Sequence, residues 1–65
     1  MNLGELITEK REDLGYRKVE FSKIIGVGYD TLRDWEMGGS IPTGKNMRRL
    51  VEVLEFTPQE IELYF

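Results

Sequence analysis

The sequence predicts an all-α fold, a compact orthogonal bundle of five short helices. Apolar residues recur at the three- and four-residue spacing of helix faces, and no stretch alternates apolar and polar residues as a strand does. Short joints rich in glycine and proline separate the periodic segments, which favours helices packed across one another. The 65 residues are expected to form one domain, 1–65, because the chain is too short for two cores.

Capping signals mark the expected helices, which cover about 3–14, 18–25, 29–37, 44–55 and 58 onward. Asn2 and Glu5 form a capping pair before the first helix. Thr43 is expected to cap the fourth helix. The start signal of the fifth is Thr57-Pro58-Gln59-Glu60, with Pro at the first helical position.

Residues 18–37 have the spacing of two short helices joined by a tight turn. A small residue, Ser22, stands four positions before Gly26, and Leu32 and Trp35 follow at helical spacing. Gly26 ends the first of these helices, because only a residue without Cβ turns there at low cost. This pattern predicts a helix-turn-helix unit, whose second helix is shaped to enter a DNA major groove.

Nothing in the composition points to catalysis. The chain contains no cysteine and no histidine, which excludes disulfides, Cys/His zinc sites and Cys–His or Ser–His nucleophile pairs. The Gly-x-Gly at 26–28 is a helix joint, because no strand precedes it. We therefore expect no enzyme activity, no catalytic residue, no metal site and no cofactor.

Charge is unevenly distributed along the chain. The formal net charge is −3, although DNA binders usually present a basic face. All nine Lys and Arg residues lie within 1–49, whereas residues 50–65 carry Glu and no base, so the acid can face away from a nucleic acid. No apolar run approaches the ~20 residues of a membrane span and no leader is apparent, so we expect a cytoplasmic protein with no membrane partner.

Several residues, in matching order and spacing, resemble the Cro/C1-type (XRE-like) helix-turn-helix family of phage repressors and small bacterial regulators. Arg11 matches the family arginine, and Trp35-Glu36-Met37-Gly38 resembles its Trp-Glu-Arg-Gly signature, with Pro42 soon after. The stretch 50–57 resembles the segment that leads into the last helix. The resemblance covers nearly the whole chain and implies a lambda repressor-like DNA-binding domain. Arg17 and Lys18 depart from it, because the family often has Ser or Thr and then Gln there.

The resemblance also implies roles for individual residues. Arg11 and Glu36 would form a buried or half-buried ion pair that ties the first helix to the third. The outward residues of the third helix would read bases, with Gly28 at the helix mouth followed by Tyr29, Asp30, Thr31, Arg33 and Asp34. Phosphate contacts are expected from Arg17, Lys18, Gly39, Ser40 and Lys45.

Some of these residues have a plainer interpretation. Asp30 can simply favour the helix dipole, and Asp34 can pair with Arg33 or Lys45. Three further cations are expected to be ordinary surface charges: Lys23, Arg48 and Arg49. Three aromatic residues fall on inner faces and are expected in the core rather than stacked on bases: Phe21, Trp35 and Phe56.

The last helix offers more apolar surface than a core of this size needs. Its apolar residues either cap the core or meet a partner: Ile61, Leu63, Tyr64 and Phe65. Members of the resembled family commonly dimerise through their last helices, so we expect a homodimer with two recognition helices about one DNA turn apart on a palindrome.

The sequence thus predicts a sequence-specific DNA-binding transcriptional regulator, similar to a repressor or a Cro-like protein, with double-stranded DNA as partner. The alternative is a protein-interaction module on the same fold, such as an antitoxin, an antirepressor or an adaptor. The acidic tail, the two aspartates of the third helix and the lost glutamine favour that alternative. A contiguous positive face would favour DNA, and a face interrupted by Asp30 and Asp34 would favour a protein partner.

Overall fold

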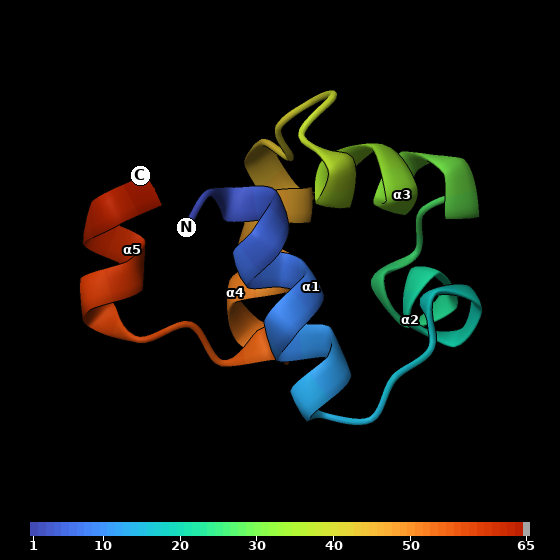
Figure 1. The fold of residues 1–65 in the computed structure, drawn as a ribbon, viewed down its shortest axis with the longest axis horizontal. Helices are drawn as coiled ribbons and strands as arrows, with labels where there is room; N and C mark the ends of the chain where they lie inside the picture. Colours follow the sequence, from blue (N-terminus) through green and yellow to red (C-terminus); the bar gives the residue numbers. More distant parts are fainter. Residues whose placement is uncertain (65) are drawn as a thin grey trace.

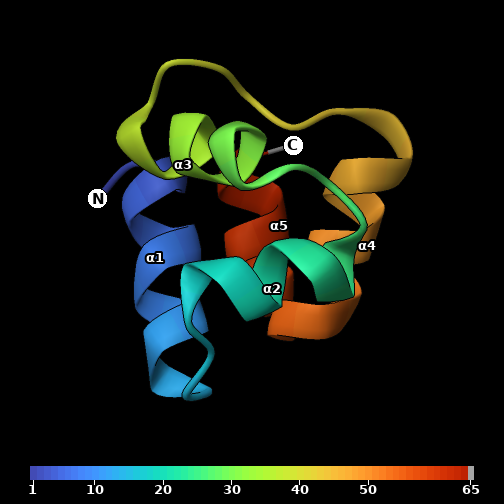
Figure 2. The same ribbon diagram turned by 90° about the vertical axis from the view of Figure 1, so that its right-hand side faces the viewer.

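The computed structural model describes residues 1–64, and in this range the chain forms helices without strands (Figure 1). Figure 2 shows α2 in front, between α1 and α4, with α3 lying across the upper end of the bundle. The predicted all-α fold is confirmed. The helices, in order, are α1 (Leu3–Asp13), α2 (Lys18–Ile25), α3 (Tyr29–Met37), α4 (Gly44–Leu54) and α5 (Pro58–Tyr64).

The predicted cap of α1 is present with both of its hydrogen bonds. The Asn2 N–H donates to Glu5 Oε1 at 3.0 Å, and the Glu5 N–H donates to Asn2 Oδ1 at 2.8 Å. Two helices end one residue before the predicted limit, because Leu14 and Glu55 occupy the C-cap positions of α1 and α4. Glu55 takes a left-handed conformation with φ of 56°.

The other helix starts differ in how they are capped. Thr43 occupies the predicted N-cap position of α4 with an extended backbone, although its side chain makes no capping hydrogen bond. The predicted cap of α5 is present, since Glu60 N–H donates to Thr57 Oγ1 at 3.2 Å and Thr57 N–H donates to Glu60 Oε1 at 2.8 Å. The Thr57 N–H and the Lys10 ammonium, whose Nζ lies 2.9 Å from Glu60 Oε1, lower the pKa of the Glu60 carboxyl below its usual value.

The turn between α2 and α3 is built as predicted. Gly26 has φ of 83°, a left-handed conformation that favours glycine. The N–H groups of Gly26 and Val27 both donate to the carbonyl oxygen of Ser22, at 2.9 and 3.0 Å. These two hydrogen bonds end α2, and the chain then turns and continues into α3.

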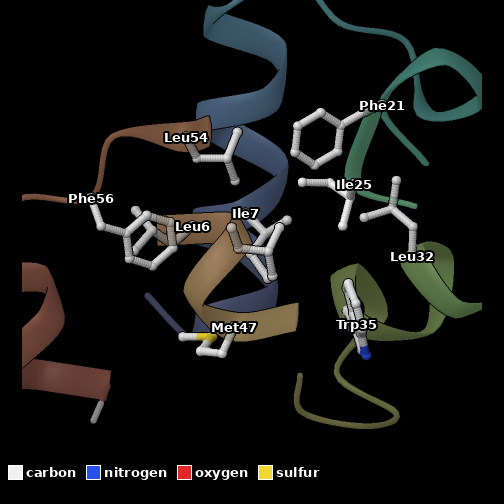
Figure 3. Packing of buried hydrophobic residues seen from close by; sticks show 10 residues of the cluster. Leu6, Ile7, Phe21, Ile25, Leu32, Trp35, Met47, Leu54 and Phe56 are labelled. Carbon is white, nitrogen blue, oxygen red and sulfur yellow. The ribbon is translucent and has the colours of Figure 1, made fainter. Parts of the chain in front are cut away.

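The core lies where the helices meet, and Figure 3 shows its side chains pointing toward one another from α1, α2, α3 and α4. Phe21, Trp35 and Phe56 are buried, so the prediction that they are core residues is confirmed. The fully buried side chains are Ile7, Phe21, Leu32 and Leu50.

An ion pair predicted from the family resemblance joins α1 to α3 inside the protein. Arg11 Nε donates to Glu36 Oε2 at 2.8 Å and Arg11 Nη2 donates to Glu36 Oε1 at 3.1 Å, a two-bond arrangement. The two side chains are 7% and 3% exposed. Thr8 Oγ1 donates to Glu36 Oε1 at 2.9 Å, and Arg11 Nη1 donates to the Tyr16 carbonyl oxygen at 2.7 Å. The pair is therefore fully hydrogen-bonded, as a buried pair must be to be tolerated.

The same two helices approach closely at Gly4. A Cβ on Gly4 would lie 2.6 Å from the Trp35 carbonyl oxygen and 2.7 Å from that of Glu36. Both are backbone atoms, which cannot move aside as a flexible side chain can. Glycine at this position lets α1 pack directly against the backbone of α3.

We expect Glu36→Ala to unfold much of the protein, because it leaves the Arg11 guanidinium buried without a carboxylate. The loss should be about 3–5 kcal/mol, a large part of the stability of a small domain. Thermal unfolding followed by circular dichroism measures it. Glu62→Ala removes an exposed carboxylate from α5 and serves as the control. Unfolding of Glu36→Ala at the wild-type temperature would contradict the scaffold role.

We expect Gly4→Ala to lower the melting temperature, although alanine is the better helix former by ~1 kcal/mol. The added methyl group must push α1 away from α3, and overpacking of this kind costs about 1–3 kcal/mol. Thermal denaturation of the variant decides the sign. A rise in melting temperature would show that α1 and α3 are not in close backbone contact.

Candidate nucleic-acid interface

The outward side of α3 is open to solvent, while its inner side holds the buried residues Leu32, Trp35 and Glu36. Figure 1 shows α3 at one edge of the bundle with no other helix covering its upper side. An exposed helix flank of this kind is what a major-groove reader needs. Every residue predicted to read bases is exposed: Gly28, Tyr29, Asp30, Thr31, Arg33 and Asp34.

Two of these residues form a loose pair in the first turns of α3. Arg33 Nη2 lies 3.8 Å from Asp30 Oδ1, and the side chains are 53% and 87% exposed. An exposed pair with this separation contributes little stability. The Arg33 guanidinium therefore keeps its donors available, although a carboxylate stands beside it on the same face.

Asp34 is held by the loop that follows α3. Ser40 Oγ donates to Asp34 Oδ2 at 2.6 Å, and the Gly39 N–H donates to the Asp34 carbonyl oxygen at 2.9 Å. The expectation that Asp34 pairs with Arg33 or Lys45 is wrong, because the turn at the end of α3 brings the Ser40 hydroxyl onto the carboxylate first. A Cβ on Gly39 would displace the Asp34 carboxylate from this position.

The start of α2 lies beside the start of α3. Arg17 and Lys18 line a shallow hollow of about 640 Å³ together with Tyr29. Arg17 has no side-chain capping bond, and its N–H donates to Glu20 Oε1 at 2.9 Å. The structure thus brings two of the expected phosphate contacts next to the expected reading helix.

Lys45 does not join that hollow. It lines a different groove, between the end of α2 and α4, together with Lys23 and Arg48. Lys23 lines both hollows. Lys23 was expected from the sequence to be an ordinary surface charge. Its place in both linings follows from the way α2 crosses α4, which the sequence does not encode.

The apolar residues of α5 divide between core and surface. Ile61 and Tyr64 pack against the core, and the Tyr64 hydroxyl donates to the Met1 carbonyl oxygen at 2.8 Å. Leu63 is 76% exposed. Phe65 lies outside the described residues. Of the predicted dimer contacts in residues 1–64, Leu63 is the one that presents most of its side chain outward.

Two further features of residues 1–64 bear on function. No three His, Cys, Asp or Glu side chains come together there in a way that could hold a metal ion. Within the same residues, no helix has both the length and the apolar character needed to cross a membrane.

Comparison with known proteins agrees with this architecture. A family model described as helix-turn-helix matches residues 7–61. The chain is 33% identical over 58 residues to the HTH-type transcriptional regulator DicA of Escherichia coli (strain K12), covering 89% of this chain and 43% of DicA. It is 33% identical over 60 residues to the type II methyltransferase M.SsoII of Shigella sonnei, covering 88% of this chain and 16% of that protein.

The chain spans less than half the length of either relative, so their names describe proteins with much additional sequence. No solved structure gives a significant match. The buried Arg11–Glu36 pair, the turn at Gly26 and the match to residues 7–61 agree with one another, and the chain belongs to the Cro/C1-type (XRE-like) helix-turn-helix family.

Proposed function

We propose that this chain is the DNA-binding domain of a sequence-specific transcriptional regulator, with α3 in the major groove. The main support for the proposal is that the outward side of α3 is exposed and that α3 follows a left-handed turn at Gly26. The similarity to DicA supports a regulatory role in transcription. The domain is expected to cover residues 1–65 and to act without a cofactor.

The exposed side chains of α3 suit base recognition. Arg33 can donate two hydrogen bonds to guanine O6 and N7, and Thr31 can contact a thymine methyl group. Tyr29, 43% exposed, offers a ring face and a hydroxyl at the start of the helix. The Asp30 carboxylate can accept from cytosine N4 or hold the Arg33 guanidinium toward the bases, since the two lie 3.8 Å apart.

Contacts to phosphates would come from both sides of α3. Arg17 and Lys18 lie at the start of α2, and Lys45 lies in the first turn of α4. Backbone N–H groups at the start of α4 have no side-chain cap from Thr43, so they can add to the attraction of a phosphate. Such contacts set the position of the domain on DNA rather than its sequence preference.

A homodimer on a palindromic operator is part of the proposal. Two copies would place their α3 helices about one DNA turn apart, roughly 34 Å. Leu63 on α5 supports this, because it is an exposed apolar side chain on a helix that also contributes to the core.

A protein-interaction role is the second candidate. The Asp30 side chain is 87% exposed and interrupts the positive charge around Arg33, which a protein partner with basic residues would tolerate better than a phosphate backbone would. Selection of DNA from a random pool separates the two proposals.

We expect the wild-type chain to retain duplexes from a random pool at about 50 mM salt and to release them steeply as salt rises. Fluorescence anisotropy with a labelled, selected duplex measures the dissociation constant against salt. The selected sequences should share a symmetric motif if the dimer is correct. Failure to retain any duplex at low salt would contradict DNA binding and favour the protein-interaction role.

We expect Arg33→Ala and Lys18→Ala to affect DNA binding in different ways. Arg33→Ala should cost about 1–3 kcal/mol on the selected sequence and relax one base position, because it removes a base contact. Lys18→Ala should weaken the selected and the scrambled duplex alike, because it removes a phosphate contact. Competition binding with both duplexes measures this. Equal weakening on both duplexes by Arg33→Ala would remove its role in reading bases.

A further inference from the structure

The basic side chains of residues 1–64 fall into two groups. Lys10, Arg11 and Arg33 each have a carboxylate oxygen within 4.0 Å. The others have no carboxylate oxygen within that distance in this part of the chain: Arg17, Lys18, Lys23, Lys45, Arg48 and Arg49. No nearby carboxylate in residues 1–64 therefore neutralises these six cations.

Four of these cations gather in one groove, called here the α2–α4 groove. It has a volume of about 480 Å³, and its charged lining is Lys23, Lys45, Arg48, Arg49 and Glu52. Figure 2 shows the end of α2 next to α4. The four positive charges of the groove outnumber its one carboxylate, so the cations repel one another. This repulsion lowers the stability of the folded protein unless an anion is bound.

The wall of the groove is fixed by a hydrogen bond between the two helices. Arg49 Nη2 donates to the Ile24 carbonyl oxygen at 3.3 Å, which ties α4 to the last turn of α2. Lys23, Lys45 and Arg48 are exposed. Arg49 is therefore a positioning residue, and the other three side chains can reach a ligand.

The α2–α4 groove and the hollow at the start of α2 share one lining residue, Lys23. Cations therefore run from Arg17 and Lys18 through Lys23 to Arg48. The groove is open, and its long, flexible cations suit a run of separated phosphates better than one small anion. A phosphodiester backbone has this repeated charge.

We propose that the α2–α4 groove binds the phosphodiester backbone of DNA outside the base pairs read by α3. The inference rests on the proposed function, because it adds a second contact to the same duplex. Lys23 and Arg48 bind phosphates there, and they raise affinity and salt dependence without adding sequence preference. The sequence at the α3 contact would still determine which site is chosen.

The test measures DNA affinity against salt for Arg48→Gln and for Lys23→Gln/Arg48→Gln. The probe is a labelled duplex of about three helical turns carrying the sequence that the wild-type chain enriches from a random pool. Gln59→Glu is the matched control, because it changes the net charge by the same single unit as Arg48→Gln on α5, away from the groove. No variant should unfold at a lower temperature than wild type, since the three replaced side chains are exposed.

Each lost phosphate contact should reduce the slope of log affinity against log salt by about one. Between about 50 and 200 mM salt, the affinity of each protein for DNA falls by some factor. That factor should be about 3.5 times smaller for Arg48→Gln than for wild type, and about ten times smaller for the double variant. The Gln59→Glu control should keep the wild-type slope. Shortening the duplex to the selected motif should remove the difference between wild type and the double variant.

Three results would overturn the inference, and they are distinguishable. If the wild-type chain binds DNA and the double variant keeps its salt slope, the groove contact is wrong and the proposed function stands. If the double variant loses self-association in sedimentation while its DNA slope is unchanged, the groove binds an acidic segment of a second copy instead. If the wild-type chain retains no duplex, the proposed function fails and the groove contact fails with it.

Discussion

The two hydrogen bonds between Arg11 and Glu36 fix the angle at which α3 leaves the bundle. Glu36 lies on the inner face of α3, one residue from the buried Trp35, so the pair and the core hold the same face of the helix. Thr8 shares the carboxylate, and Gly4 allows the backbones to meet one turn earlier on α1. Because these contacts hold its inner face, α3 keeps its position in the bundle while its opposite face remains exposed to solvent.

The exposed face of α3 combines attraction and repulsion toward DNA. Under the proposed function, Arg33 would be attracted to the duplex, while Asp30 would be repelled unless it accepted a hydrogen bond from a base. Asp34 is partly withdrawn, because Ser40 holds its carboxylate against the loop. The cations that lack a carboxylate within 4.0 Å in residues 1–64 lie instead on α2, at its N-cap residue Arg17, and on α4. This arrangement favours a protein whose affinity comes from the flanks of α3 and whose selectivity comes from α3 itself.

Much of the fold could be predicted from sequence because its signals are local. Helix periodicity, the glycine at 26 and the capping pairs at Asn2 and Thr57 each act within a few residues. The Arg11–Glu36 pair came from family resemblance, since nothing local links residues so far apart. The partner of Asp34 and the two hollows that share Lys23 depend on how α3 turns into its loop and how α2 crosses α4. No spacing in the sequence encodes those geometries.

Under the proposed function, the outward face of α3 is the surface that contacts DNA. Titration of ¹⁵N-labelled protein with a selected duplex, followed by amide chemical shifts, tests it most directly. We expect the largest shifts at residues 28–34 and at Arg17 and Lys18, with little change along α5 beyond any dimer contact. Large shifts confined to α5 and α1, with the amides of α3 unmoved, would contradict it.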